Sequence, residues 1–275
     1  MRRALAIVLV LCMAPVTSMV DTQNNHLSHL EILPEPLLSY GVNTQNFTFS
    51  NTIIQSSYNT SVTALSYNSD GELSFGGQVC GMFPAEYYAR SQPTCTYESS
   101  NGSNSHTGYQ PAIFGDVNRN GTIANTEIIN SSLGGDRIDA ILHLSNGDHL
   151  ISGWYCWGNS AQPGSCEISK DGVTSTAYEG DDAFIARVDQ NGTWLWSITM
   201  GGASWDTTHS LAEGPNGELF ALTSFCVNSG NSCQVNLAGT GVNTSNGADD
   251  LIIMEISPTG TIQWTQQMGS SESDH

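Results

Sequence analysis

The 275-residue chain contains seven Lys plus Arg against 26 Asp plus Glu, which gives a formal net charge of −19 at pH 7. A surface this negative repels nucleic acid and anionic lipid, so nucleic acid is not expected as a partner. Charged residues nevertheless make up only 12% of the chain, and hydrophobic residues make up 39%. This apolar content is too high for a disordered protein, and the abundance of Gly, Ser, Thr and Asn is typical of a turn-rich β protein.

The N-terminus has the three parts of a cleaved signal peptide. Met1 to Arg3 carry positive charge, Ala4 to Ala14 form an apolar run, and Val16-Thr17-Ser18 suit a peptidase. We therefore expect residues 1–20 to be the signal peptide and residues 21–45 to be a lead-in segment. The apolar run is shorter than the ~20 residues that span a bilayer. The sequence predicts a mature chain without a transmembrane segment, secreted or displayed at the cell surface.

One sequence pattern occurs three times along the chain. Its first part is a pair of β-rich runs joined by an Asp-Gly or Asn-Gly turn, at residues 64–75, 140–151 and 210–221. This is the strongest short-range signal of a β-hairpin. Its second part is another hairpin, with turns at residues 120–122, 191–193 and 259–261. Two hairpins make a four-stranded antiparallel unit, and such units in tandem build β-propellers.

The second copy carries the clearest family signature. Residues 180–197 read Gly-Asp-Asp-Ala-Phe-Ile-Ala-Arg-Val-Asp-Gln-Asn-Gly-Thr-Trp-Leu-Trp-Ser, and Met200-Gly201-Gly202 follows. This stretch resembles the SBBP family of β-propeller repeats, and residues 247–269 are similar but looser. The resemblance covers roughly residues 60 to 275. It implies an all-β fold of tandem four-stranded antiparallel blades, β-propeller-like, but no particular function, because such repeats serve as scaffolds.

The repeat region is expected at residues 46–275. We place the units at about 56–133, 134–200 and 201–268, with the start of a fourth unit at 269–275. Residues 46–55 resemble an orphan outer strand, the piece that an N-terminus commonly lends to the last blade of a ring. Closed propellers use about four to eight blades, so three units predict an incomplete ring. Additional blades in a longer protein and pairing of partial rings as an oligomer both remain open.

Six cysteines follow the predicted signal peptide, two in the loop between the hairpins of each unit. They are Cys80, Cys95, Cys156, Cys166, Cys226 and Cys233. One pair per unit in an exported chain favours three local disulfides. Zinc is the alternative use, but the spacing differs between the copies and no nearby His or Cys completes a finger pattern.

Residues 116–127 fit the twelve-position calcium loop, which places oxygen ligands at alternate positions and Gly at the sixth. The candidate ligands are Asp116, Asn118, Asn120, Thr122 and Glu127. The same stretch aligns with an ordinary hairpin of the next unit, where Arg187 replaces the first ligand. A polar β-turn is therefore the favoured interpretation and calcium the alternative. No other cofactor is expected.

Acidic pairs recur at fixed places in the units. Residues 181–182 and 249–250 could act as acid and base, but their position before corresponding strands indicates turns or bonds to backbone amides. Asp136, Asp206 and Asp274 precede the first strands, which indicates hydrogen bonding between blades. We therefore predict no catalytic residue among them.

Histidines and tryptophans offer weaker signals. His143 and His149 flank one hairpin and could share a metal, although solvated side chains are the simpler interpretation. Trp194, Trp196 and Trp264 are similar to the tryptophans of quinone-dependent propellers, although core packing between blades is the favoured interpretation. No nucleophile elbow, phosphate loop or His-Glu-x-x-His helix is present.

The sequence favours a secreted or surface-displayed, non-catalytic β-propeller scaffold. Its predicted partner is an extracellular protein or glycan, bound by the disulfide-tied loops between hairpins. A quinone-dependent or hydrolytic propeller enzyme, with its site in a missing part, is the first alternative. A structural array in an envelope layer is the second.

Overall fold

The computed structural model describes most of the repeat region. The described residues are 55–56, 59–68, 71–81, 94–99, 102–107, 110–119, 121–157, 164–238 and 240–274. The chain divides into two parts, Met1–Asn46 and Phe47–His275, and the described residues all lie in the second. The predicted signal peptide (1–20), the lead-in (21–45) and most of the predicted orphan strand (46–55) lie outside the described residues.

Each repeat unit forms an arrangement of four neighbouring antiparallel strands. In spatial order, the first unit consists of β2 (Asn59–Tyr67), β3 (Leu73–Gly81), β6 (Ala112–Val117) and β7 (Ile123–Ile129). The second consists of β8 (Gly135–His143), β9 (His149–Trp157), β12 (Asp182–Val188) and β13 (Trp194–Gly202). The third consists of β14 (Trp205–Glu213), β15 (Leu219–Val227), β18 (Asp250–Ile256) and β19 (Ile262–Met268).

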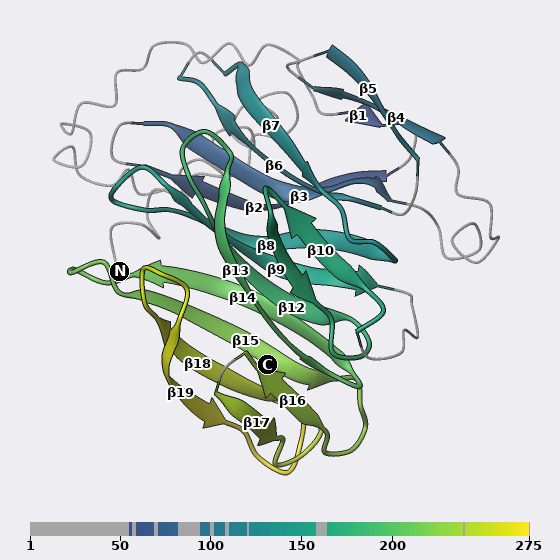
Figure 1. Ribbon diagram of the computed structural model, residues 1–275, viewed down its shortest axis with the longest axis vertical. Coiled ribbons are helices and arrows are strands. Elements are labelled where there is room, and N and C mark those ends of the chain that lie inside the picture. The colour runs from purple at the N-terminus through teal and green to yellow at the C-terminus, as the bar shows by residue number, and fades with distance from the viewer. Residues whose placement is uncertain are drawn as a thin grey trace, which may run out of the picture. The chain divides into compact units, whose positions relative to one another are not determined.

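The three sheets follow one another, from the first unit at the top of Figure 1 to the third at the bottom. The predicted all-β fold of tandem four-stranded antiparallel units is therefore confirmed, and the described residues close no ring. Within this described part of the chain, no helix is long and apolar enough to cross a membrane.

A glycine with positive φ lies in the turn of each first hairpin. Gly71, Gly147 and Gly217 have φ of +84°, +91° and +85°, a region that a side chain makes unfavourable. In the second unit the Gly147 N–H donates to the Leu144 carbonyl at 3.0 Å and closes the turn. The Asp-Gly and Asn-Gly pairs thus mark these turns because glycine supplies the left-handed residue.

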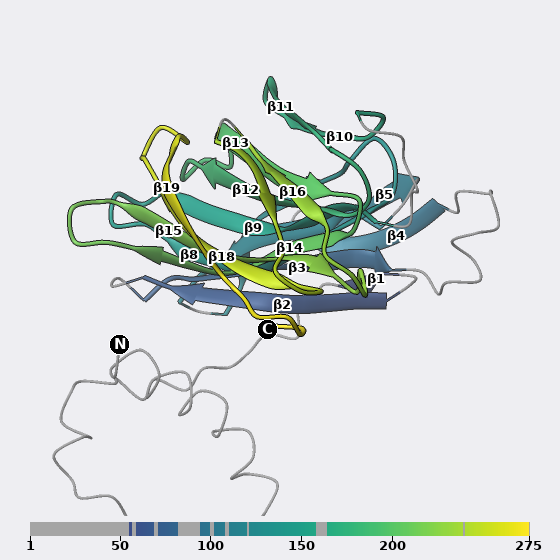
Figure 2. The same ribbon diagram turned by 90° about the horizontal axis from the view of Figure 1, so that it is seen from below.

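Each unit carries an additional hairpin between its second and third strands. These inserted hairpins are β4 (Thr94–Ser99) with β5 (Gly102–Thr107), β10 (Glu167–Lys170) with β11 (Val173–Thr176), and β16 (Gln234–Leu237) with β17 (Gly241–Thr244). Figure 2 shows β10 and β11 projecting beyond the sheets. The sequence predicts only loops in these places, because the strands are short and polar and lack a clear alternation. The sequence did contain one signal, the Asp171-Gly172 pair, which is typical of a type I′ turn. In the structure both residues have positive φ, as such a turn requires.

The three predicted disulfides are confirmed. They join Cys80 with Cys95, Cys156 with Cys166, and Cys226 with Cys233. The first cysteine of each pair is the eighth residue of the second strand of its unit and has a positive φ, between 58° and 68°. Each disulfide therefore connects the end of a second strand to the inserted hairpin that follows it.

The inserted hairpin of a unit pairs with the end of the preceding outer strand. The pairs are Val235 with Gly202, Ile168 with Ser131, and Tyr97 with Ser56. In all three, the hairpin residue lies two positions after the second cysteine of its disulfide. In the first unit the inserted hairpin pairs with β1 (Gln55–Ser56), which occupies the position that an outer strand has before the other two units. This is the place predicted for the orphan strand 46–55, of which only Gln55 is described.

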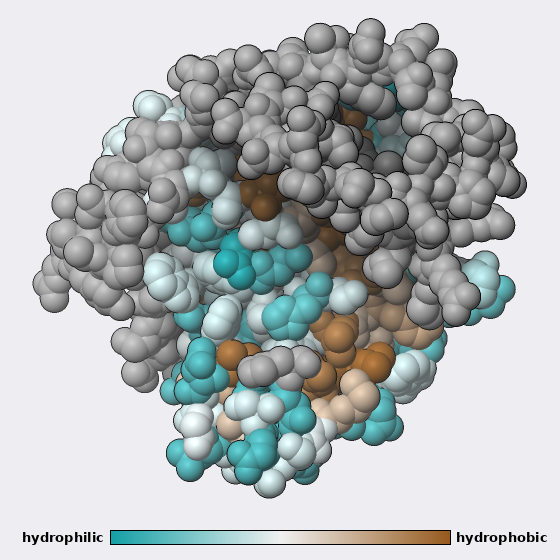
Figure 3. Space-filling model, turned by 180° about the vertical axis from the view of Figure 1, so that it is seen from behind, coloured by the Kyte–Doolittle hydropathy of each residue, from teal (hydrophilic) through white to brown (hydrophobic). Residues whose placement is uncertain are grey.

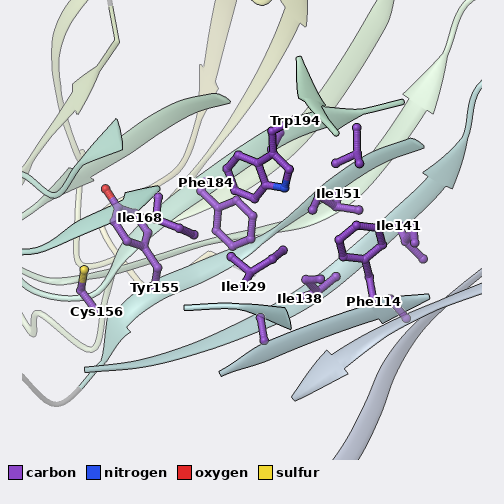
Figure 4. Packing of buried hydrophobic residues seen from close by; sticks show 14 of the residues in the cluster. Phe114, Ile129, Ile138, Ile141, Ile151, Tyr155, Cys156, Ile168, Phe184 and Trp194 are labelled. Carbon is purple, nitrogen blue, oxygen red and sulfur yellow. The ribbon is translucent and has the colours of Figure 1, made fainter. Parts of the chain in front are cut away.

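Apolar side chains fill the space between successive sheets. Between the first and second units, Phe114 and Ile138 belong to one cluster with Phe184 and Trp194 (Figure 4). The rings of Phe184 and Trp194 are stacked with their centroids 6.3 Å apart. Full burial of one such side chain contributes about 1.5–3 kcal/mol. The predicted core packing is confirmed for Trp194 but wrong for Trp264, which is 45% exposed because no described sheet covers β19.

Candidate functional site

The predicted calcium loop forms the hairpin that joins β6 and β7. Asn118 Nδ2 donates to Thr122 Oγ1 at 3.1 Å, so these two predicted ligands lie together. The other two described ligands face different partners: Asp116 accepts a hydrogen bond from Ser74, and Glu127 pairs with Lys170 at 2.8 Å. Asn120 lies outside the described residues. Calcium binding by this loop stays a prediction.

The acidic pairs bond to backbone amides, as the sequence predicts. Asp182 accepts from the Tyr178 N–H, and Asp250 accepts from the Asn246 N–H at 3.0 Å. Gly201 lies beneath the Asp182 carboxylate, which occupies the space that a Cβ would take. The Met-Gly dipeptide of the repeat is thereby explained, because the buried carboxylate needs a glycine on the neighbouring strand.

Two buried aspartates join the start of a first strand to the cysteine of the second strand. Asp136 accepts from the Cys156 N–H at 3.1 Å, and Asp206 accepts from the Cys226 N–H at 2.9 Å. The Asp206 N–H in turn donates to the Asp181 carbonyl at 2.8 Å. The predicted hydrogen bonding by these aspartates is confirmed. Together they form a repeated frame at the end of the units where the first strands begin.

Burial controls the ionisation of this frame. It raises the pKa of Asp136 to about 7 and the pKa of Asp206 to about 8, although backbone N–H donors act in the opposite direction. Burial also raises the pKa of Asp182 to about 9, and the charge of Asp206 adds to this shift. These three carboxyl groups are therefore protonated at mildly acidic pH and lose their protons in the neutral to alkaline range.

A pocket of about 540 Å³ lies at the same end of the units. It is lined by side chains from all three units, with three tryptophans among them: Gln78, Gln110, Arg137, Trp154, Trp157, Asp181, Trp205 and Asn228. We call it the tryptophan pocket. The aspartate frame positions its walls directly, because Arg137 and Trp205 each adjoin a frame aspartate in the chain.

The polar groups of the tryptophan pocket are held in place. Arg137 Nε donates to Asp139 Oδ1 at 2.6 Å, and its guanidinium lies 5.1 Å from the Trp154 ring centroid, a cation–π arrangement. Trp154 and Trp157 have ring centroids 6.2 Å apart and planes inclined by 56°. Trp154 is only 5% exposed, so the half-buried Trp157 and Trp205 supply the aromatic faces of this wall, beside charged and amide groups. The wall can pack against an apolar ring face and hydrogen-bond the ring substituents.

The residues of the tryptophan pocket differ between units, while the frame repeats. Trp154 is the sixth residue of β9, and the sixth residues of β3 and β15 are Gln78 and Ser224. Arg137 is the third residue of β8, where β14 has Thr207. Variable side chains on a repeated backbone are typical of a binding site carried by a scaffold.

Sequence reasoning missed the tryptophan pocket, because its residues are spread from Gln78 to Asn228 and only the fold brings them together. It also predicted solvated histidines, whereas His149 is only 4% exposed and His143 is half-buried. The ring centroids of the two histidines lie 4.2 Å apart. The signal was their placement at the two ends of one hairpin, which makes them cross-strand neighbours.

Comparison with known proteins shows no family for this chain. No protein-family model matches the chain, and no curated protein matches it. Among solved structures, the chain is similar to a protein of unknown function from Bacteroides caccae, with 11% identity and a TM-score of 0.26 over 76% of this chain and 82% of that one. A similarity of this size supports no conclusion about function.

Proposed function

We propose that this protein is a secreted or surface-displayed, non-catalytic β-propeller-type scaffold that binds a glycan in the tryptophan pocket. The observation that carries the proposal is the pocket itself: three tryptophans, an arginine, an aspartate and amide side chains around about 540 Å³. Pockets of about 300–1,000 Å³ suit small ligands or a few units of a chain ligand.

The chemistry of the wall favours a glycan over a protein. A sugar ring has an apolar C–H face, which packs on an indole, and hydroxyl groups, which pair with planar amide and charged side chains. A protein partner would instead need a contact of about 800 Å² per side, broader than this concavity. The pocket therefore fits one or two sugar rings.

The remaining features support an extracellular setting. Three disulfides are compatible with an extracellular protein, because such bonds persist in oxidising compartments. The signal-like N-terminus and the resemblance of residues 180–202 to SBBP repeats support the same proposal. The inserted hairpins border a second, hydroxyl-rich depression of about 480 Å³ that extends the contact surface.

A glycan array followed by tryptophan fluorescence tests this function. We expect at least one neutral oligosaccharide to bind and to change the emission of the wild-type protein. Trp157→Ala is expected to weaken binding at least tenfold, whereas Trp264→Ala, which alters an exposed tryptophan on β19, is expected to bind like wild type. No binding to any glycan, or equal binding by Trp157→Ala and wild type, would contradict the proposal.

Recovery of the bound oligosaccharide separates a binding protein from an enzyme. We expect mass spectrometry to show the same oligosaccharide, unchanged, after prolonged incubation with the protein. Cleavage products that depend on the protein would support a hydrolytic enzyme instead.

A further inference from the structure

The junction between the first and second units contains a polar cluster, and two of its positions are apolar at the next junction. Ser74 is the second residue of β3, and His149 is the first residue of β9. The corresponding residues at the junction of the second and third units are Leu150 and Leu219, both buried in the core. Packing between units is therefore achieved with leucines, and it does not explain a buried histidine and serine at these positions.

Four side chains converge in this cluster. The Ser74 hydroxyl lies 2.6 Å from His143 Nε2 and 3.0 Å from His149 Nε2, and it donates to Asp116 Oδ1. Asp116 Oδ1 is 3.2 Å from His149 Nε2. One ligand atom each of Asp116, His143 and His149 lies within 4.8 Å of the others. The three donor atoms thus surround a single point beside the Ser74 hydroxyl.

The donor set selects a class of metal. Two imidazoles and one carboxylate are ligands of Zn²⁺ and related transition-metal ions, with metal–ligand distances of about 2.0–2.2 Å. Calcium and magnesium prefer sets made only of oxygen. The net charge of −19 raises the local concentration of any cation.

The Nδ1 atoms of the cluster set the expected strength of binding. Both His143 Nδ1 and His149 Nδ1 are buried without a hydrogen-bond partner in the described structure. When a metal takes Nε2, the proton moves to Nδ1, where an acceptor would normally support it. Because that support is missing, we expect affinity about 10–100-fold below that of a fully supported site. Such a site exchanges its ion.

We propose that Asp116, His143 and His149 bind one divalent transition-metal ion of the Zn²⁺ type, with the Ser74 hydroxyl or a water as fourth ligand. The ion would bridge the first and second units, because Asp116 and Ser74 belong to one and the histidines to the other. This site lies among the hairpin turns, at the opposite ends of the strands from the tryptophan pocket, and it does not depend on the proposed glycan binding.

Cobalt titration of the whole, chelator-treated protein tests the proposal. We expect one Co²⁺ to bind with visible absorption bands and to be displaced by Zn²⁺ but not by Ca²⁺. His149→Leu places at this position the residue type that the third unit has, and it is expected to lower affinity at least about 100-fold, more than loss of a supporting contact would. His209→Gln is the control, because His209 is an exposed histidine outside the cluster.

Asp116→Asn is the second variant, in case His149→Leu disturbs the fold as judged by circular dichroism. It is also expected to lose Co²⁺ binding. Wild-type protein that binds neither Co²⁺ nor Zn²⁺ would overturn the proposal. Equal affinity of wild type and a folded His149→Leu or Asp116→Asn protein would overturn it as well.

A second inference comes from the two end faces of the stack of sheets. The fourth residue of the first strand is Val62 in the first unit, Ile138 in the second and Thr208 in the third. Ile138 and Thr208 are fully buried against the preceding unit, whereas Val62 is 52% exposed and Leu65 beside it is 63% exposed. The first unit therefore presents an uncovered copy of a face that is buried in the other two units.

The third unit presents the complementary face. In each unit, one residue near the end of the outer strand pairs with the start of the third strand. These residues are Ile129, Met200 and Met268. Ile129 and Met200 are buried, whereas Met268 is 40% exposed. Figure 3 shows apolar side chains at the surface over the third unit. The two end faces are thus the two halves of the interface that already joins successive units.

We infer that a second copy of this chain covers both end faces, with the first unit of each copy against the third unit of the other. A twofold axis would bury both faces at once.

Sedimentation velocity tests this arrangement. We expect wild-type protein to sediment with twice the mass of one chain and Leu65→Asp to sediment as a monomer. Leu195→Asp is the control, because Leu195 is 48% exposed on β13, away from the end faces. Monomeric wild-type protein, or a folded Leu65→Asp protein that still dimerises, would overturn the inference.

Discussion

Replacing Asp206 by alanine tests whether the buried aspartate frame stabilises the units. The Asp206 carboxyl accepts N–H groups from Gly202 at 3.0 Å and Cys226 at 2.9 Å in a buried site. Alanine leaves both N–H groups without an acceptor, at about 1–3 kcal/mol each, or about 2–6 kcal/mol together. Asp274→Ala is the matched control. Asp274 accepts the Ser270 N–H at an exposed position, where water substitutes and we expect a loss below about 0.5 kcal/mol.

The effect of Asp206→Ala depends on pH. Burial raises the pKa of Asp206 from 3.8 to about 8, so the folded protein holds a proton that the unfolded chain releases. The stability from this group is complete below the unfolded pKa and is lost as the pH rises towards the folded pKa. The loss is about 1.4 kcal/mol per pH unit. This loss offsets about 2 kcal/mol of the contribution of the two hydrogen bonds at pH 5 and about 4 kcal/mol of it at pH 7.

Urea unfolding followed by tryptophan fluorescence and circular dichroism measures these effects. At pH 5 we expect Asp206→Ala to lower the free energy of unfolding by about 1–4 kcal/mol, clearly more than Asp274→Ala. By pH 7 most of the difference from wild type should disappear. Equal losses for the two variants at pH 5, or a larger loss for Asp206→Ala at pH 7 than at pH 5, would refute the reasoning.

Three further predictions concern packing, turns and disulfides. Ile138→Ala is expected to lower the free energy of unfolding in urea by about 2–5 kcal/mol, whereas Leu195→Ala, at a 48% exposed position of β13, should lower it by less than about 0.5 kcal/mol; similar losses would contradict the packing. Gly147→Ala at φ +91° is expected to cost about 1–2 kcal/mol in thermal unfolding, and an unchanged midpoint would refute the turn geometry. The double variant Cys226→Ser, Cys233→Ser should lower the free energy of unfolding in guanidinium by about 2–3 kcal/mol. No loss would show that this disulfide does not stabilise the inserted hairpin.

The sequence was sufficient to predict the four-stranded units, because their signals are local. Asp-Gly and Asn-Gly turns require a left-handed glycine such as Gly147, and the flanking runs are rich in β-branched and aromatic residues. The cysteine pairing followed from one pair per unit, and all three disulfides are present. Local chemistry that repeats along a chain can be recognised without knowledge of the tertiary fold.

The inserted hairpins and the tryptophan pocket could not be predicted in the same way. β10 contains Glu167, Ile168, Ser169 and Lys170, and only Ile168 is buried, so no periodic pattern identifies it. Trp154 and Trp205 come together because β9 and β14 lie side by side after folding, a non-local contact that spacing in the sequence does not reveal. The burial of His149 likewise depends on Ser74 and Asp116 of the preceding unit.

A crystal structure of the protein soaked with an oligosaccharide identified on the array tests the central claim most directly. The account predicts electron density for a sugar ring in the tryptophan pocket, against Trp157 or Trp205 and within hydrogen-bond distance of Arg137 or Asp181. An empty tryptophan pocket at saturating oligosaccharide, or density for the sugar only at another place on the surface, would contradict the account.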